Sequence, residues 1–391
     1  MTNEVRNVPD LRFPGFENEW EESNIDNEFD FFNNKRKPIK ENLRNKGEYP
    51  YYGATGIIDY VDDFIFDGNF ILIGEDGANI VSRSAPLVYF ATGKFWVNNH
   101  AHILYPKFGD IYFNYLLLEN IDYEKYNTGT AQPKLNVQNL KKIKIKSPRD
   151  NSEQQKIGEF FSKLDRQIEL EEQKLSLLEK QKKGYMQKIF SKELRFKDEN
   201  GNNYPEWEEK NLKELIDVRD GTHESPKPSK DGYLLVTSKN LKNSKLDLSE
   251  SYFISKEDYE SINQRSKVEI GDILFGMIGT IGNPILLEEC DFAIKNVALL
   301  KTNDLLEKYY ILNFLKSSNI SKQFYRMNAG GTQKFIALST IRDLNIDMPS
   351  SEEAIKIGNF FNKVDNLIEN QSNKLELLKK RKQGFLQKMF I

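Results

Sequence analysis

The feature that most constrains this chain is an internal repeat of a 38-residue segment. Residues 153–190 read EQQKIGEFFSKLDRQIELEEQKLSLLEKQKKGYMQKIF and residues 353–390 read EAIKIGNFFNKVDNLIENQSNKLELLKKRKQGFLQKMF, so that 20 of 38 positions are identical without a gap. A repeat of this kind means that the chain contains two copies of one structural unit. The chain is therefore predicted to consist of two similar halves.

Shorter matches recur in the same order through the rest of the two halves. The matched motifs are Leu11-Arg12-Phe13 with Leu194-Arg195-Phe196, Trp20-Glu21-Glu22 with Trp207-Glu208-Glu209, Gly74-x-x-Gly77 with Gly276-x-x-Gly279, Phe95-x-Val97-x-Asn99-x-Ala101 with Phe292-x-Ile294-x-Asn296-x-Ala298, and Asn127-x-Gly129-x-x-Gln132 with Asn328-x-Gly330-x-x-Gln333. Their shared order extends the repeat to the whole chain. We expect a globular domain over 1–150, a helical arm over 151–192, a second domain over 193–349 and a second arm over 350–391.

The two arms have the period of a coiled coil, because their apolar residues alternate in steps of four and three. Polar residues interrupt the pattern at Glu171 and Lys182 in the first arm, and at Gln371 and Lys382 in the second. The predicted seam residues are Ile157, Phe161, Leu164, Ile168, Leu175 and Leu178, then Ile357, Phe361, Val364, Ile368, Leu375 and Leu378. A single helix cannot bury such a seam, so we expect an antiparallel intramolecular coiled coil with pseudo-twofold, cyclic symmetry.

The two globular domains have a different pattern. Their apolar residues come in short runs, such as FIFDGNFILIG at 64–74 and DILFG at 272–276, which are rich in β-branched and aromatic residues and are bounded by glycine. Such runs are typical of buried strands. Helical patterns intervene at 111–122 and 307–318. The predicted fold class is α+β, with two mixed α/β domains that alternate with two long helices.

Composition excludes several classes of protein. Lys and Arg total 56 against 59 Asp and Glu, a net charge of −3, so the chain does not coat nucleic acid by bulk attraction and any such binding is local. The single cysteine, Cys290, excludes a disulfide framework and a cysteine-rich zinc site. No apolar stretch approaches the ~20 residues of a membrane span, and nothing near Met1 resembles a signal sequence. We expect a cytoplasmic protein with no membrane contact.

The chain carries no recognisable catalytic motif. It has no GxxxxGK[ST] phosphate loop, and its Asn283-Pro284 does not continue as the Asn/Asp-Pro-Pro-Tyr/Phe tetrapeptide of DNA amino-methyltransferases. His100 and His102 would share one strand face and could hold a metal, but no third ligand accompanies them, and two ordinary strand residues are the simpler interpretation. The sequence predicts no catalytic residue, no metal and no cofactor bound by this chain.

The repeated motifs resemble a known family. The helix starts IGxFFxK[LV]D, the helix ends Gly184-Tyr185-Met186-Gln187-Lys188-Ile189-Phe190 and Gly384-Phe385-Leu386-Gln387-Lys388-Met389-Phe390, the LRF and WEE motifs, and the stretch YPYYGATG at 49–56 are similar to the DNA-specificity (S) subunit of type I restriction-modification systems. The resemblance covers essentially the whole chain and includes the order of its parts.

That resemblance implies a function. Each globular domain would be a target recognition domain that reads one half of a bipartite sequence in double-stranded DNA, and the coiled coil would set the spacing. Two methylation subunits, which hold S-adenosylmethionine, would dock on the arms and domains. Restriction subunits, which use ATP and Mg²⁺, are further partners in some complexes. The chain by itself would not be an enzyme, but one subunit of a methyltransferase and endonuclease complex.

Candidate DNA-binding residues are polar, basic or aromatic side chains in glycine-rich or polar loops, since such side chains meet phosphates and base edges. In the first domain they are Lys35, Arg36, Lys37, Tyr51, Tyr52, Thr55, Arg83, Asn98, Asn99, His100, Thr130, Gln132 and Lys134. In the second they are Thr222, His223, Ser238, Lys239, Asn240, Lys295, Asn296, Thr332, Gln333 and Lys334. Asn99 with Asn296, and Gln132 with Gln333, match between the halves, which favours roles in the frame or in backbone contact.

Two other classes of function remain open at this point. The chain could be a self-sufficient DNA-binding regulator, or a coiled-coil adaptor that does not touch DNA. The basic helix ends, which include Lys180, Lys182 and Lys183 and again Lys380, Arg381 and Lys382, also have two interpretations. They could complement the helix dipole on a solvated face, or contact DNA or an acidic partner.

Overall fold

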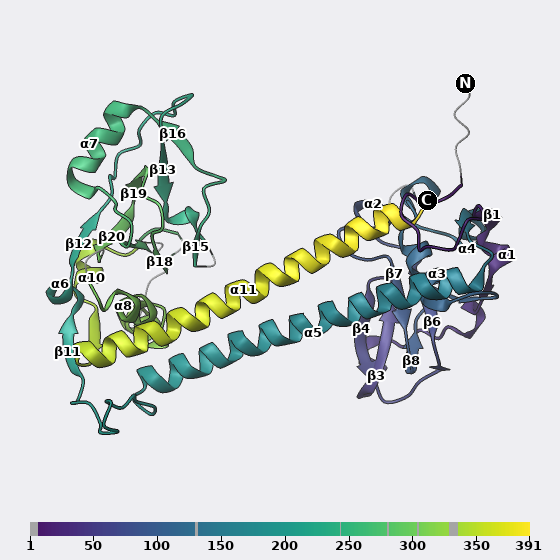
Figure 1. Ribbon diagram of the computed structural model, residues 1–391, viewed down its shortest axis with the longest axis horizontal. Helices are drawn as coiled ribbons and strands as arrows, with labels where there is room; N and C mark the ends of the chain where they lie inside the picture. Colours follow the sequence, from purple (N-terminus) through teal and green to yellow (C-terminus); the bar gives the residue numbers. More distant parts are fainter. Residues whose placement is uncertain (1–6, 130–131, 243, 280, 303–304, 328–334) are drawn as a thin grey trace. The chain divides into compact units, whose positions relative to one another are not determined.

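The computed structural model describes residues 7–129, 132–242, 244–279, 281–302, 305–327 and 335–391 (Figure 1). The chain divides into two compact units. The first unit is Met1–Glu172 with Asn373–Ile391, and the second is Gln173–Ser372. Each unit therefore contains one globular domain together with a part of each of two long helices.

The globular domain of the first unit contains ten strands and short helices among its described residues. The strands are β1 (Glu21–Asn24), β2 (Phe29–Phe31), β3 (Lys46–Gly53), β4 (Gly56–Val61), β5 (Phe66–Asp67), β6 (Phe70–Gly74), β7 (Val88–Ala91), β8 (Lys94–Val97), β9 (Ala101–Pro106) and β10 (Lys144–Ser147). The α-helices are α1 (Ile25–Glu28), α2 (Asn79–Ser82), α3 (Ile111–Glu119) and α4 (Val137–Lys142).

The second globular domain has more helix. Its strands are β11 (Glu208–Asn211), β12 (Asp217–Asp220), β13 (Tyr233–Thr237), β14 (Leu241–Lys242), β15 (Lys245–Leu246), β16 (Tyr252–Ile254), β17 (Ile273–Gly276), β18 (Gly282–Leu286), β19 (Phe292–Lys295), β20 (Val297–Lys301) and β21 (Asn345–Met348). Its helices are α6 (Leu212–Leu215), α7 (Lys256–Ser266), α8 (Lys308–Leu315), α9 (Ser318–Met327) and α10 (Leu338–Arg342).

The two domains share one sheet topology. The main four-stranded sheet has the order β2-β9-β6-β7 in the first domain and β12-β20-β17-β18 in the second, and the pairings in both are antiparallel. A second sheet contains one parallel pair in each domain, β3 with β8 and β13 with β19. Each domain also closes with a pair between its first and last strands, β1 with β10 and β11 with β21. The mixed α+β prediction is confirmed.

The domains differ at the sheet that contains the parallel pair. In the first domain β3 forms a long hairpin with β4, and β5 extends the sheet beyond β8. In the second domain β13 pairs with β16, the small hairpin β14–β15 follows, and helix α7 is added. The added elements of the second domain lie around β13 and β19 in Figure 1. The shared frame therefore carries different additions at equivalent places.

The arms are two long helices, α5 (Asn151–Phe190) and α11 (Ser351–Met389). Within each unit they pack antiparallel, because the first turns of one helix lie beside the last turns of the other. In the first unit Phe161 contacts Phe390, with ring centroids 6.1 Å apart. In the second unit Phe361 stacks on Phe190 at 5.7 Å. The predicted seam residues are buried or half-buried, which confirms the coiled-coil pattern.

The two lysines that interrupt the seam form ion pairs across it. Lys382 lies 2.6 Å from Asp165 in the first unit, and Lys182 lies 2.5 Å from Asp365 in the second. These are equivalent positions of the repeat. A lysine in the seam is therefore matched by an aspartate on the facing helix, which the sequence pattern by itself shows only as a gap in the apolar repeat.

A buried carboxylate joins each domain to the start of its helix. Glu153 accepts two hydrogen bonds of 2.6 Å from Arg12 and one of 3.4 Å from the Trp20 indole. Glu353 accepts bonds of 3.3 and 2.7 Å from Arg195 and one of 3.0 Å from the Trp207 indole. Both carboxylates are fully buried. The LRF and WEE motifs thus supply the arginine and the tryptophan of a junction that is made twice.

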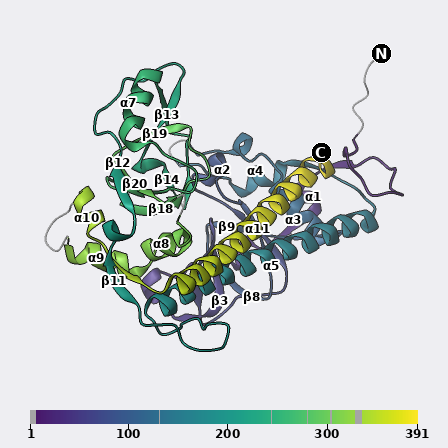
Figure 2. The ribbon, with the colours of Figure 1, turned by 60° about the vertical axis from the view of Figure 1, so that its left-hand side comes forward.

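Two matched glycines let a domain helix approach an arm. A Cβ on Gly158 would lie 2.0 Å from Asp110 Oδ1 beside α3, and one on Gly358 would lie 2.8 Å from the Tyr310 nitrogen in α8. Helix α8 lies against the first turns of α11 in both ribbon views (Figure 1, Figure 2). The glycine of each IGxFF motif is therefore required by close packing.

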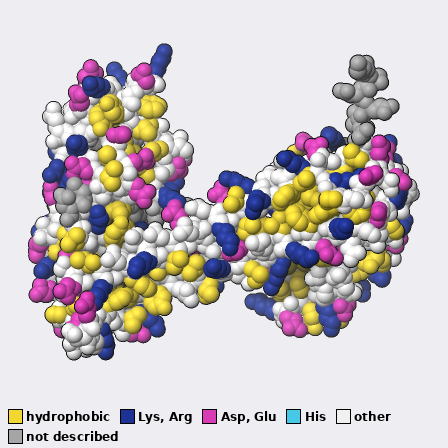
Figure 3. Space-filling view, in the orientation of Figure 1, with side chains coloured by type: hydrophobic (Ala, Val, Ile, Leu, Met, Phe, Trp, Pro, Cys, Tyr) yellow, Lys and Arg dark blue, Asp and Glu magenta, His cyan; other side chains and the backbone are white. Residues whose placement is uncertain are grey.

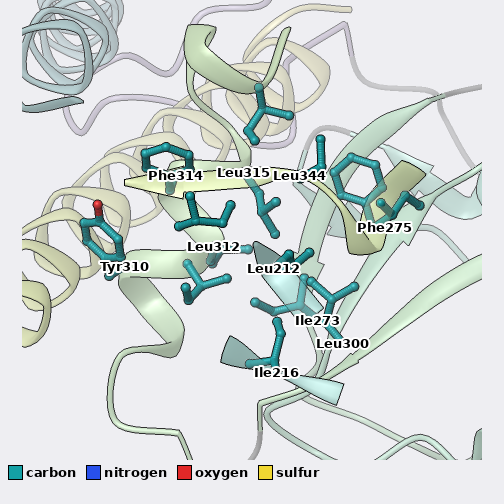
Figure 4. Packing of buried hydrophobic residues seen from close by; sticks show 14 of the residues in the cluster. Leu212, Ile216, Ile273, Phe275, Leu300, Tyr310, Leu312, Phe314, Leu315 and Leu344 are labelled. Carbon is teal, nitrogen blue, oxygen red and sulfur yellow. The ribbon is translucent and has the colours of Figure 1, made fainter. Parts of the chain in front are cut away.

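The hydrophobic core of each unit spans its sheet and its arms. In the second unit Phe275, Ile273 and Leu300 from the sheet pack with Tyr310, Phe314 and neighbouring residues of α8, as Figure 4 shows. Ile357, Phe361 and Phe190 of the arms belong to the same cluster. The corresponding cluster of the first unit joins Ile71, Phe113 and Phe390. Each unit is thus a continuous body that includes its part of both arms.

Candidate nucleic-acid interface

Loops that are far apart in the sequence converge at one end of the main sheet in the first domain. The backbone nitrogen of Glu75, after β6, donates to the carbonyl of His100, between β8 and β9, at 2.8 Å. Leu135 donates to the carbonyl of Glu75 at 2.8 Å, and Gly77 donates to Pro133 at 3.0 Å. These bonds tie residues 75–77, 98–100 and 132–135 into one loop cluster, which we call the first loop cluster.

Arg36 holds this cluster together. Its guanidinium lies 2.6 Å from the Glu75 carboxylate and also donates to the carbonyls of Asn99 and Ala101, at 3.2 and 3.1 Å. Only 17% of its side chain is exposed. We predicted Arg36 as a DNA contact; the structure shows it engaged with protein groups from two other loops.

His100 is presented differently. Its Nδ1 lies 2.6 Å from Asp76 Oδ2, and its backbone nitrogen donates to Asn98 Oδ1 at 2.8 Å. The imidazole is nevertheless 49% exposed. His102, two residues further, lies on β9 and is buried, with Nε2 2.7 Å from the carbonyl of Leu135 and Nδ1 2.9 Å from Asn33 Nδ2. His100 precedes the strand, so the expectation that the two histidines share one strand face is wrong.

The other candidates of the first domain fall into two groups. Tyr51, Tyr52 and Asn98 are buried, and Arg83 pairs with Glu119 at 2.9 Å, so these side chains serve the fold. The exposed candidates are Lys35, Lys37, Thr55, Asn99, Gln132 and Lys134. Thr130 lies outside the described residues. The structure therefore reduces the candidate set to a few accessible side chains around His100.

An equivalent cluster forms in the second domain. Thr222 donates through its backbone to Ile294 at 3.0 Å and receives a bond of 3.1 Å from the Asn296 nitrogen. Ser238 Oγ donates to the carbonyl of Asn296 at 3.0 Å and accepts from the Met277 nitrogen at 3.1 Å. The segments 222–223, 237–240, 276–279 and 295–296 thus form the second loop cluster. Asn99 and Asn296 both lie in the short connection that leads into the central strand, β9 or β20.

The side chains of the second cluster differ from those of the first. The His223 imidazole uses both ring nitrogens, Nδ1 at 2.8 Å from Asn296 Oδ1 and Nε2 at 2.9 Å from Asp220 Oδ2. Ser238 and Asn240 are buried, and the Lys295 ammonium donates to Ser225 Oγ. Lys239 is exposed. The predicted residues Thr332, Gln333 and Lys334 lie outside the described residues.

The matched Gly-x-x-Gly loops border both clusters. Gly77 and Gly279 have φ values of +108° and +71°, a backbone region that disfavours side chains. No atom of the described chain lies within 4 Å of the place where a Cβ would stand on either glycine. Each loop thus leaves an open backbone surface beside the candidate residues.

Sequence reasoning missed the acidic members of the first cluster. Glu75 and Asp76 occupy the two middle positions of the Gly74-x-x-Gly77 motif, and they hold Arg36 and His100. Charge of both signs is also interspersed over the face drawn in Figure 3, in keeping with the net charge of −3. The sequence does contain a signal for these acids, because two carboxylates lie inside a repeated glycine motif. Their partners, Arg36 and His100, could not be identified from the sequence because they lie far away in the chain.

An aromatic pocket of about 450 Å³ is lined by residues of the β3–β4 hairpin, of β7 and of α3. Thr55 and Gly56 line one side of it, and Tyr89, Tyr112 and Tyr115 line another. Burial raises the pKa values of Tyr112 and Tyr115 well above the ordinary range of a phenol. The pocket is therefore uncharged and does not suit a phosphate.

No group of three or more His, Cys, Asp or Glu side chains that could hold a metal occurs among the described residues. Burial lowers the pKa of His102, so this imidazole is a neutral partner of Asn33 and Leu135. Among the same described residues, no helix is both long and apolar enough to cross a membrane.

Two sheet-cored domains that share a frame, pack on paired helical arms and present different loop clusters define a two-domain recognition scaffold. Comparison with known proteins identifies its family. A family model described as "Type I restriction modification DNA specificity domain" matches residues 17–180 and again residues 204–380. The chain belongs to this family and contains two such domains.

Individual relatives agree. The chain is 38% identical over 135 residues to a putative type I restriction enzyme specificity subunit of Haemophilus influenzae, a match that covers 34% of each protein. It is 23% identical over 408 residues to the type I restriction enzyme MjaVIII specificity subunit of Methanocaldococcus jannaschii, covering 96% of this chain and 92% of that one. The crystal structure of the S subunit from M. genitalium has the same fold, with a TM-score of 0.71 at 18% identity over 98% of this chain and 99% of that one.

Proposed function

We propose that this chain is the DNA sequence-specificity subunit of a type I restriction-modification complex, in which each domain reads one half of a bipartite target. The observation that carries the proposal is that, in each domain, the frame is the same as in the other domain while the loop cluster differs. Sheet order, arm packing and the buried Glu153 and Glu353 junctions recur in both units. The loop clusters occupy equivalent ends of equivalent sheets but differ in their side chains. Two readers of different half-sites on one duplex require this combination.

The chemistry is proposed to lie in partner chains. Two methylation subunits would dock on the arms and domains and hold S-adenosylmethionine, and restriction subunits, where present, would use ATP and Mg²⁺. The repeat supports a pair of identical partners, since the arms keep 20 of 38 residues while the domains keep short motifs.

Co-purification tests the division of labour. The tagged chain is expressed with its methylation subunit, and the complex is expected to contain two copies of that subunit for each copy of this chain. The methylated motif is then determined by sequencing genomic DNA of a host with and without this chain. A bipartite motif that depends on the chain is expected. Methyl transfer to DNA by the isolated chain would contradict the proposal, and so would a complex that binds DNA without sequence preference.

The proposed role of the arms in spacing has a separate test. Insertion of one heptad into both α5 and α11 adds about 10 Å to the paired helices at ~1.5 Å per residue. This is the length of about three base pairs at ~3.4 Å each. The spacer between the half-sites is expected to change while both half-sites persist. An unchanged spacer in a folded, active complex would reject the arms as the element that sets the distance.

A further inference from the structure

We infer that His100 is a base-reading side chain of the first recognition domain, and that Asp76 fixes its tautomer and orientation. This inference rests on the proposed function and names a residue that carries sequence choice in the first half-site.

His100 is fixed by two hydrogen bonds to its backbone and one to its side chain. Asn98 Oδ1 accepts its backbone N–H at 2.8 Å, the Glu75 nitrogen donates to its carbonyl at 2.8 Å, and Asp76 holds Nδ1 at 2.6 Å. Asp76 is itself placed by an antiparallel bridge with Lys134. A residue whose backbone is fixed and whose side chain is held by a neighbouring carboxylate loses little conformational freedom on binding, which favours specific contact.

The Asp76 carboxylate also determines what the ring offers to solvent. A carboxylate only accepts hydrogen bonds, so the proton of a neutral imidazole lies on Nδ1. Nε2 then carries a lone pair. Among the described residues no partner lies within hydrogen-bond distance of His100 Nε2, and the side chain is 49% exposed. The neutral ring thus presents a fixed hydrogen-bond acceptor at the surface of the first loop cluster.

The charges of the cluster favour a base contact over a phosphate contact. Arg36 and Lys134 lie 2.6 and 3.5 Å from Glu75, and His100 lies beside Asp76. Beside His100 the two cations are therefore matched by two carboxylates, whereas the exposed Lys35 and Lys37, which flank Arg36, suit phosphate contacts. An acceptor such as Nε2 suits the amino groups of adenine N6 or cytosine N4, which are donors in the major groove.

The second domain provides a natural contrast. His223 lies in the equivalent loop cluster, but both of its ring nitrogens have partners, Asn296 at 2.8 Å and Asp220 at 2.9 Å. The same residue type therefore has no free nitrogen there. We assign base reading in the first half-site to His100, so His223→Gln controls for the loss of a histidine outside the first domain.

The experiment uses the complex with its methylation subunits and the motif found in the host genome. In His100→Ala, one position of one half-site is expected to accept a second base, while the other half-site stays unchanged. Binding of the purified complex to duplexes with single base-pair changes should show about 3- to 10-fold less discrimination at that position, the worth of one hydrogen bond. A duplex whose base there lacks the exocyclic amino group should weaken wild-type binding similarly and leave His100→Ala unaffected.

Asp76 is a positioning residue, and its variants separate that role from a structural one. Asp76→Ala should relax the same base position as His100→Ala, and the double variant should relax it no further. Asp76→Asn keeps an oxygen that accepts from Nδ1–H and should retain the wild-type motif. His223→Gln should leave the first half-site unchanged, because His223 lies in the second domain. Thermal unfolding of each variant and a second substitution, His100→Gln, confirm that a change in motif does not reflect loss of the fold.

The outcomes are distinguishable. A wild-type complex without any sequence preference refutes the proposed function itself. A selective wild-type complex whose motif and discrimination are unchanged in His100→Ala overturns this inference alone. Equal weakening against every duplex, with discrimination intact, also overturns it, because that result identifies His100 as a phosphate or structural contact.

Discussion

The two domains of this chain have the same internal frame and different loop clusters. Trp20, Arg12 and Glu153 in the first unit correspond to Trp207, Arg195 and Glu353 in the second, with the same buried hydrogen bonds. At the loop clusters Asn99 still matches Asn296 and Gly77 matches Gly279, but most of the other side chains differ. This difference shows where the amino-acid sequence is constrained. The junction side chains that pack against the arm are the same in both units, whereas most side chains at the solvent-facing end of the sheet differ.

The histidines of the two clusters illustrate the change. His100 has one ring nitrogen bound to Asp76, whereas His223 has both nitrogens bound, to Asn296 and Asp220. The connection between the sheets is also shorter in the second domain, since Asn296 alone separates β19 from β20 while residues 98–100 separate β8 from β9. Equivalent loops can thus carry different chemistry without any change in strand order.

Of the changes that test this comparison, exchange of one domain is expected to have the largest effect on the recognised DNA motif. If residues 25–147 are replaced by the corresponding segment of a relative, one half-site should be replaced completely and the other should persist. The reason is that β1, Trp20 and the arms are retained, and the incoming segment brings its own equivalent of β10 to pair with β1. Methylome sequencing of the host gives the answer. A change in both half-sites would show that the two domains do not read independently.

Removal of a junction carboxylate is expected to have the next largest effect. Glu153→Ala leaves Arg12 and the Trp20 indole without their acceptor in a fully buried place. Loss of one member of a buried pair typically costs about 3 to 5 kcal/mol, and we expect a decrease of about 3 kcal/mol in unfolding free energy. Urea unfolding measures it, and Glu353→Ala should lower the stability of the second unit to a similar degree.

A surface glutamate on the same helix is the control for that pair. Glu159 is 53% exposed and pairs with Lys163 one turn away at 3.3 Å. Glu159→Ala should cost less than about 0.5 kcal/mol, as for other exposed helical pairs. Equal costs for Glu153→Ala and Glu159→Ala would mean that the buried junction contributes no more than an ordinary surface pair.

The parts of the fold that the sequence predicts are those with a local period or a repeat. The seam from Ile157 to Leu178 was predictable because a 3.5-residue period in helices reports directly on burial. The sharing of one frame was predictable because Trp20 and Arg12 recur as Trp207 and Arg195. Neither inference needs knowledge of which distant residues meet.

The candidate site was predicted only in outline, because its contacts depend on long-range geometry. Loop composition selected Arg36 and His100 alike, yet Glu75 engages the first and Asp76 orients the second. The two acids lie 39 and 24 residues from their partners in the chain. Residue type alone does not tell a side chain that holds a loop from one that faces a ligand. Only the surrounding contacts distinguish the two roles.

A smaller effect is expected where the arm junctions of the two units differ. In the first unit Asp165 accepts a bond from Tyr112 at 2.6 Å beside Lys382. In the second unit Lys316, which caps α8, takes a place near Lys182 and Asp365. Burial and, to a smaller extent, the charge of Lys182 lower the pKa of Lys316 to about 8, against the opposing effect of Asp365. When it is charged, Lys316 therefore destabilises the folded state relative to the unfolded chain.

The sign of the pH dependence follows from proton binding. An unfolded lysine has a pKa near ~10.4, so between about pH 8 and pH 10 the unfolded chain binds more protons and stability rises with pH. Below about pH 8 both states are charged and the full penalty persists. Lys316→Met should raise unfolding free energy at pH 7 by about 2 kcal/mol and flatten this rise. Lys125→Met, at a side chain that is 75% exposed, is the control; a gain there as large as at Lys316 would contradict the burial argument.

The smallest effect is expected from a circular permutant. The Leu11 nitrogen donates to the carbonyl of Lys388 at 2.8 Å, as the Leu194 nitrogen donates to that of Lys188 at 3.0 Å where the chain is continuous. Phe390 stacks on Phe113 at 5.5 Å, just as Phe190 packs on Phe314 at 5.3 Å. A short linker from Ile391 to Asn7 would therefore reproduce in the first unit a connection that the second unit already has.

New ends can be placed at the exposed turn of Asn200 and Gly201, where Gly201 has a φ of +83° and lies in open surroundings. The permutant should unfold within about 1 kcal/mol of the original chain, because termini that lie close together permit such joining. Urea unfolding and the methylated motif are the measurements. A second permutant opened at Leu177, in the middle of α5, interrupts the arm and should lose most of its stability. If the two permutants were equally stable, the continuity of the arm would not be what holds each unit together.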